Sequence, residues 1–152
     1  MSNNYFGELM QKVRLRFGVL CVESKNGYRT ILKLSKENIN TLNIIIGDQS
    51  PGGNSSKQWV DFLQRDTAFL IGADRIAKKG NHAVVFPSFK KIKRGQYEIT
   101  FTLIEEFPKQ CESNAIIDKY AKVLEETIQA SPELWLWSHR RWKLTPSTEV
   151  NS

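Results

Sequence analysis

Apolar residues near the start of the chain recur three or four positions apart, the spacing of one helix face. They are Phe6, Leu9, Met10, Val13 and Phe17. We therefore predict an amphipathic helix over residues 5–17, ended by Gly18. The short apolar run at 19–22 predicts a strand, and the spacing over 27–34 predicts a second, shorter helix.

The segment TLNIIIG, residues 41–47, is rich in β-branched residues and almost entirely apolar. A run of this kind is typical of a central parallel strand that is covered on both faces. The polar turn formers DQSPGGNSS follow it and predict a loop. In open α/β sheets, ligands bind at the carboxyl ends of the strands, so this loop is a candidate binding element.

The middle of the chain predicts one helix and one hairpin. Helical spacing and a capping Thr67 indicate a helix that ends at Gly80. Residues 82–89 and 96–104 predict two strands joined by the basic turn KKIKRG. Apolar and polar residues alternate over 97–103, so this second strand should present one face to water.

The C-terminal part begins with a long amphipathic helix over 114–130. Ser131 and Pro132 then predict a further short helix within PELWLWSHRRWK. We expect Leu134 and Trp137 on this helix to pack against the long helix, while nearby cations face phosphates. Residues 145–152 predict a frayed tail.

Helices and strands alternate along most of the chain. This order predicts an α/β fold with a layered, mainly parallel sheet, one antiparallel hairpin and flanking helices. The 152 residues fit one domain, so we predict a single domain over 1–152.

The balance of charges favours anionic partners. Lys and Arg number 22 and Asp and Glu 16, a formal net charge of +6, which suits nucleic acid, phospholipid head groups or acidic carrier proteins. No apolar run approaches the roughly 20 residues that a membrane span needs.

Several kinds of chemistry are excluded by their missing motifs. Gly47 and Gly52 have P-loop spacing, but Gly53 and Asn54 stand where Lys and Ser or Thr are required. The two histidines and two cysteines share no ligand spacing, and no GxSxG occurs. We therefore predict no metal or other cofactor.

Five segments together resemble the bacterial lipid A biosynthesis acyltransferases, the late enzymes that add lauroyl or myristoyl chains. They are GDQSP, WVDFL, TAFLIGADRIAKKGNHAVV, RGQYEITF and YAKVLEETIQASPELWLWSHRRWK, and the likeness extends over about residues 13–143. The resemblance implies a glycerolipid acyltransferase-like α/β fold, here a partial one. It also implies transfer of a fatty acyl group from an acyl carrier protein thioester to a hydroxyl of a lipid A precursor or related lipid. The expected location is the cytoplasmic face of the bacterial inner membrane, peripheral for this chain.

The catalytic signature of that family, a His followed five positions later by Asp or Glu, is absent. Pro87 follows His82 at that distance, and Leu144 follows His139. We therefore expect the chain to correspond to the C-terminal half of such an enzyme, without a general base and inactive alone.

The resemblance also suggests substrate-binding residues. Asp48 and Gln49 would lie at the rim of the cleft, although a simple turn after the strand explains them equally well. Further candidates are Arg29, Arg75, His139, Arg140 and Arg141. Arginine offers a planar fork to phosphate oxygens, and a solvated surface is the alternative for Arg29 and Arg75.

A binding module without chemistry is the alternative function. Aromatic residues interleaved with cations suit an anionic membrane surface or single-stranded nucleic acid. No RNP, KH or helix-turn-helix signature occurs, so nucleic acid is not an expected partner.

Overall fold

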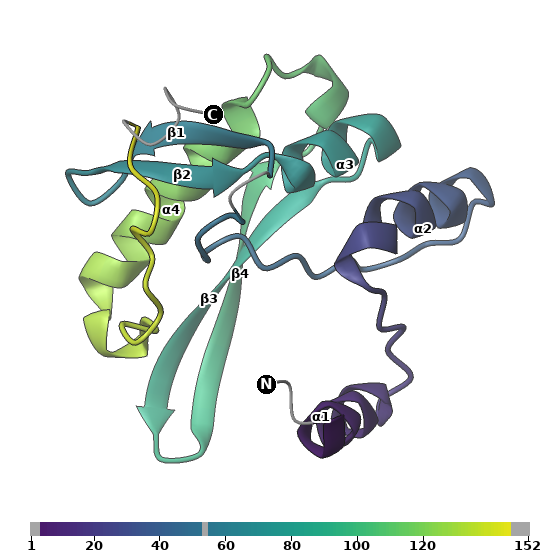
Figure 1. The fold of residues 1–152 in the computed structure, drawn as a ribbon, viewed down its shortest axis with the longest axis horizontal. Helices are drawn as coiled ribbons and strands as arrows, with labels where there is room; N and C mark the ends of the chain where they lie inside the picture. Colours follow the sequence, from purple (N-terminus) through teal and green to yellow (C-terminus); the bar gives the residue numbers. More distant parts are fainter. Residues whose placement is uncertain (1–3, 53–54, 147–152) are drawn as a thin grey trace. The chain divides into compact units, whose positions relative to one another are not determined.

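The computed structural model describes residues 4–52 and 55–146. The chain forms two compact units, Met1–Thr41 and Leu42–Ser152, and each is described by itself (Figure 1). Most of the predicted C-terminal tail, from residue 147 on, lies outside the described residues.

The first unit consists of two helices, α1 (Asn4–Leu15) and α2 (Ser24–Lys36). Both predicted helices are confirmed, and α2 is longer than its apolar spacing indicated. The predicted strand at 19–22 is wrong, because the connection between the helices has no regular structure. A strand requires a neighbour for its hydrogen bonds, and no described strand lies within this unit.

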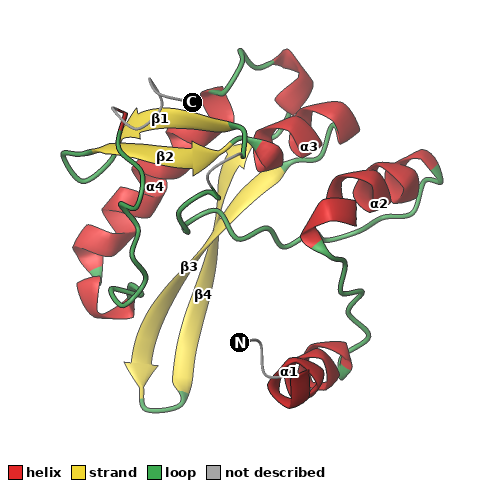
Figure 2. Ribbon diagram, in the orientation of Figure 1, coloured by secondary structure: helices red, strands yellow, loops and turns green. Residues whose placement is uncertain are grey.

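The described residues of the second unit form four strands, two α-helices and two short 3₁₀ turns. Figure 2 shows these helices and strands in different colours. The elements in chain order are β1 (Lys57–Asp61), β2 (Asp66–Leu70), α3 (Gly72–Gly80), β3 (Val84–Lys93), β4 (Gln96–Glu105), η1 (Pro108–Gln110), α4 (Ala115–Ala130) and η2 (Pro132–Leu134).

The fold is mixed α/β, as predicted, but the predicted mainly parallel sheet is not what the described strands form. β1 pairs with β2 and β3 pairs with β4, and both pairs are antiparallel. The candidate central strand, residues 41–47, forms no strand in the described structure. Leu42 and Ile44 are 80% and 85% exposed, so this apolar run has no covering layer.

Local turn chemistry explains a second difference. We predicted a helix from Thr67, yet Thr67–Leu70 belongs to β2 and the helix starts only at Gly72. Leu63 and Gln64 both adopt positive φ, 52° and 59°, between Phe62 and Arg65, whose backbones exchange two hydrogen bonds. A tight turn of this kind matches the twist of antiparallel strands and so favours β2 over a helix.

The predicted hairpin and the long C-terminal helix are confirmed as β3–β4 and α4. Helix α4 contacts β1, β3 and β4 and carries much of the core. Core side chains come from both sheets and both helices: Phe62, Phe69, Ala77, Phe86, Ile104, Ile116, Ile117, Ala121, Leu124 and Ile128.

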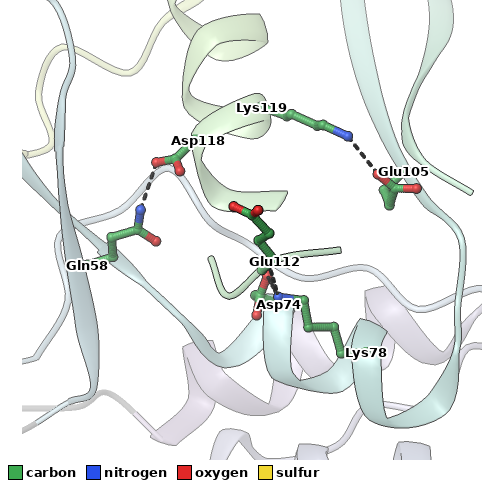
Figure 3. Close-up of polar contacts among 7 residues, drawn as sticks. All are labelled: Gln58, Asp74, Lys78, Glu105, Glu112, Asp118 and Lys119. Atoms are coloured by element: carbon green, nitrogen blue, oxygen red, sulfur yellow. Dashed lines mark hydrogen bonds and ion pairs between the residues drawn. The ribbon is translucent and has the colours of Figure 1, made fainter. Parts of the chain in front are cut away.

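Polar contacts fix the start of α4 and the neighbouring elements (Figure 3). Gln58 of β1 donates its Nε2 hydrogen to Asp118 at 2.7 Å, and Lys119 forms an ion pair of 2.6 Å with Glu105. On α3, Lys78 pairs with Asp74 at 3.2 Å and donates to the Glu112 carbonyl. These contacts tie α4 to β1 and β4, and α3 to the loop that precedes α4.

Candidate functional site

The loop at 47–51 and the segment at 139–142 meet within the second unit. The Ser50 backbone N–H donates to Nε2 of His139 over 3.0 Å, across 89 positions of sequence. The lone pair on Nε2 of His139 is therefore taken up by the Ser50 N–H in this arrangement. We call the set Asp48, Ser50, Tyr120, His139 and Arg141 the junction.

Arg141 is the most enclosed charged residue of the junction, with 2% of its surface exposed. Its Nη2 donates to the Ala68 carbonyl at 2.7 Å, and the guanidinium carbon lies 4.5 Å from the Phe69 ring centre. Burial lowers the pKa of Arg141, while nearby Tyr120 and Asp48 act in the opposite direction. The side chain therefore ties the C-terminal segment to β2 from inside the protein.

Tyr120 of α4 connects the junction to the aromatic core. Its ring meets Phe69 and Phe86 edge-on, at 6.1 and 5.6 Å between ring centres. Burial, and then the charge of Asp48, raises the pKa of Tyr120 above its ordinary value, and Arg141 counters this in part. The phenol is therefore neutral, and it can donate or accept a hydrogen bond but not act as a base.

Gly47 allows the loop to approach Tyr120 closely. A Cβ atom at this position would lie 3.2 Å from both Cζ and Oη of the tyrosine. That is tighter than an ordinary van der Waals contact, so any other residue would push the loop or the ring aside.

Two tryptophan side chains anchor the C-terminal segment beside the junction. Trp135 packs against the core beside Phe62, at 6.4 Å between ring centres. The Trp142 indole donates to Thr67 Oγ1 at 2.9 Å, and Arg65 lies over its ring at 4.7 Å. These contacts hold the segment in an irregular path across β2 and α4.

The segment is therefore not the helix we predicted. Only Pro132–Leu134 forms a 3₁₀ turn. Leu134 and Trp137 were expected to pack against the long helix, but they are 38% and 57% exposed. Trp135 and Trp142 are the tryptophans of this segment that pack against the core: Trp135 lies beside Phe62, and the Trp142 indole donates to Thr67.

The model of the bacterial lipid A biosynthesis acyltransferase family matches residues 1–144. The chain belongs to this family. A search of curated proteins found no match. GDQSP and SHRRWK belong to the first and the last of the five segments that resemble the family, and the junction is where these two segments meet.

The structure separates the predicted substrate-binding residues into three groups. Asp48, His139 and Arg141 come together at the junction. Gln49 and Arg140 are exposed beside it. The remaining two lie elsewhere: Arg75 is exposed on α3, and Arg29 lies on α2 in the first unit, where it lines a shallow groove with neighbours such as Tyr28 and Lys33.

Arg141 differs from its expected setting. We predicted that it would face phosphates with Arg140, but its guanidinium faces the interior. Sequence reasoning missed two junction groups, the Tyr120 ring and the Ser50 N–H. Tyr120 stood at an apolar position of the helical pattern, which indicated burial but not what it would meet.

The described residues contain no group of three or more His, Cys, Asp and Glu side chains that could hold a metal ion. None of the described helices is long and apolar enough to cross a membrane.

Proposed function

We propose that this chain forms the substrate side of an acyltransferase that moves a fatty acyl group from an acyl carrier protein thioester to a hydroxyl of a lipid A precursor or related lipid. Membership of the lipid A acyltransferase family supports the reaction class. The observation that carries the proposal is the junction, where the two motif segments are joined by the Ser50–His139 hydrogen bond. Asp48 and Gln49 then lie on a loop held in one position, at the rim that receives substrate.

The transfer requires a base. The acceptor oxygen attacks the thioester carbonyl, its proton passes to a base, and the carrier thiol leaves. His139 is unsuited to this role, because its Nε2 lone pair accepts the Ser50 N–H and no carboxylate follows at the family spacing. We therefore propose that the general base comes from a polypeptide segment outside residues 1–152, and that this chain is inactive alone.

The proposed site of action is the cytoplasmic face of the bacterial inner membrane, with this chain bound peripherally. A lipid acceptor lies in a bilayer, and a formal charge of +6 favours an anionic surface. An acidic carrier protein is attracted by the same excess of cations.

Reconstitution tests this proposal. The chain is assayed with lauroyl-acyl carrier protein and a lipid A precursor, alone and after co-expression with the His-x4-Glu region of a family member. We expect no turnover by the chain, none by the other region, and turnover by the pair. Turnover by the chain alone would disprove the missing-base proposal. A pair that co-purifies folded and shows no turnover would disprove the acyltransferase proposal itself.

A further inference from the structure

One face of the β3–β4 hairpin is apolar and uncovered. The antiparallel register places Phe89 opposite Ile99 and Val85 opposite Leu103, so these side chains point to the same side of the hairpin. The apolar residues on this side of the hairpin are between 42% and 62% exposed. We call this surface the hairpin face: Val85, Phe89, Tyr97, Ile99, Phe101 and Leu103.

On the other side of the same hairpin, two apolar residues near the base face the core. Phe86 and Ile104 are each 7% exposed and belong to the core, and α4 contacts both strands. The hairpin face is therefore not the core side of the hairpin. We expected strand 96–104 to present one face to water, but β4 is exposed on both faces from Gln96 to Leu103, so its apolar side chains are exposed along with the polar ones.

The tip of the hairpin is strongly basic. Lys90, Lys91, Lys93 and Arg94 lie within five positions, all exposed, with Ile92 54% exposed among them. Glu98 is the acidic residue nearest the tip on β4, and it stands opposite Lys90 in the strand register, on the side away from the hairpin face. An uncovered apolar surface is thus continuous with a run of cations.

We propose that the hairpin face docks on an anionic lipid bilayer. The proposal rests on the proposed function, because a lipid acceptor places the enzyme at a bilayer. Aromatic rings such as Phe101 and Tyr97 would lie at the level of the head groups, while the tip cations contact lipid phosphates. This pairing of apolar and basic surface favours a membrane over a protein partner.

Face-on docking also leaves the hairpin backbone solvated. Both strands of a two-stranded sheet have one edge without a strand neighbour. These edges would be costly in hydrocarbon but can bond to water and head groups at the interface. Only side chains of the hairpin face need to enter the apolar layer.

Vesicle sedimentation with the full chain tests the proposal, without acyl donor or lipid A precursor. We expect binding to phosphatidylcholine vesicles that contain about one third phosphatidylglycerol to be at least about tenfold stronger than to phosphatidylcholine alone. Two double variants should each weaken that binding at least about tenfold: Ile99→Thr with Phe101→Thr, and Lys93→Glu with Arg94→Glu. Raised salt should weaken it too.

Matched controls come from other exposed positions of the second unit. Leu136→Thr removes an exposed apolar residue of the C-terminal segment, and Lys122→Glu reverses an exposed charge on α4. Both should bind within about twofold of wild type. Helix α1 offers a competing surface in the first unit, so Leu9→Thr with Val13→Thr forms a separate arm.

Three outcomes would overturn the proposal. The first is that wild type does not bind anionic vesicles. The second is that the hairpin variants bind like wild type while the double variant of α1 abolishes binding. The third is that the hairpin face holds a second copy instead. In the last case, sedimentation velocity without lipid shows a dimer that the Ile99→Thr, Phe101→Thr pair converts to a monomer. Because this assay contains no substrate, its result does not depend on acyl transfer, and failure of membrane docking can be distinguished from failure of the proposed function.

Discussion

The junction and the hairpin face use the same kinds of residue in opposite ways. At the junction, Phe69 and Tyr120 are enclosed and Arg141 is buried against an aromatic ring. On the hairpin face, Phe89 and Phe101 are about half exposed beside a run of exposed cations. An aromatic residue next to a cation therefore does not distinguish a core from an interaction surface.

What distinguishes the two regions is the presence of partners. Nη2 of the Arg141 guanidinium donates to the buried Ala68 carbonyl in the middle of β2, whereas the hairpin cations contact no comparable group. Substitutions should therefore alter folding at the junction and binding at the hairpin.

Replacement of Arg141 should have the largest effect on stability. Arg141→Ala removes the bond to Ala68 and the contact with Phe69, so we expect the free energy of unfolding to fall by about 3 kcal/mol. Arg141→Lys keeps the charge but not the planar group that stacks on Phe69, so its free energy of unfolding should lie between those of wild type and Arg141→Ala. Urea unfolding followed by tryptophan fluorescence measures both changes. The exposed neighbour Arg140→Ala is the control, and equal effects of the two alanine variants would contradict the buried role.

Gly47→Ala should have a smaller effect. The new methyl group would lie 3.2 Å from Tyr120, and relief of that contact should cost about 1 kcal/mol of unfolding free energy. Gly72→Ala is the control, because nothing lies within 4 Å of its added Cβ. Thermal unfolding by circular dichroism compares the two. If Gly47→Ala is as stable as Gly72→Ala, the close approach of the loop to Tyr120 is wrong.

The surroundings of Glu105, at the base of the hairpin, predict that folding stability depends on pH. The Cys111 thiol, the Lys119 ammonium and the Phe107 N–H lower the pKa of Glu105 to about 2. A carboxylate with a lowered folded-state pKa stabilises the protein above its unfolded pKa, near 4.5, and that stability is lost as pH falls toward 2. Wild type should therefore lose more stability than Glu105→Gln between pH 5 and pH 2. Urea titrations across that range measure the two losses of stability. Equal losses in wild type and Glu105→Gln would contradict the lowered pKa of Glu105.

The smallest change in stability should come from the hairpin face. Ile99→Thr with Phe101→Thr replaces exposed side chains by a residue that suits strands, so the unfolding free energy should stay within about 0.5 kcal/mol of wild type. Chemical denaturation of this pair beside Arg141→Ala tests the comparison directly. A loss as large as that of Arg141→Ala would mean that the hairpin face packs inside the protein.

Patterns that are complete within one segment predicted structure well. The period of α4 and the alternation along β4 lie within those segments, and both elements appear at almost the expected bounds. The family also followed from local motifs, and the family model confirms it.

Features that depend on distant neighbours could not be predicted in this way. Residues 41–47 have the composition of a buried strand, but a strand also needs a partner strand, which the described chain does not give them. Burial of Arg141 depends on the Ala68 carbonyl, 73 positions away, and local cation spacing carries no sign of it. Of the candidate site, the sequence indicated Asp48 and His139 but not the bond from Ser50 that joins their segments.

The central claim is that the loop held by the junction takes part in acyl transfer. The most direct measurement is kcat/KM of the reconstituted pair with Asp48→Ala, compared with Asp61→Ala at the exposed end of β1. We expect Asp48→Ala to lower kcat/KM at least about tenfold while Asp61→Ala leaves it near the wild-type value. Equal activity of the two variants, both folded and paired, would contradict the claim and leave Asp48 as a residue of the turn.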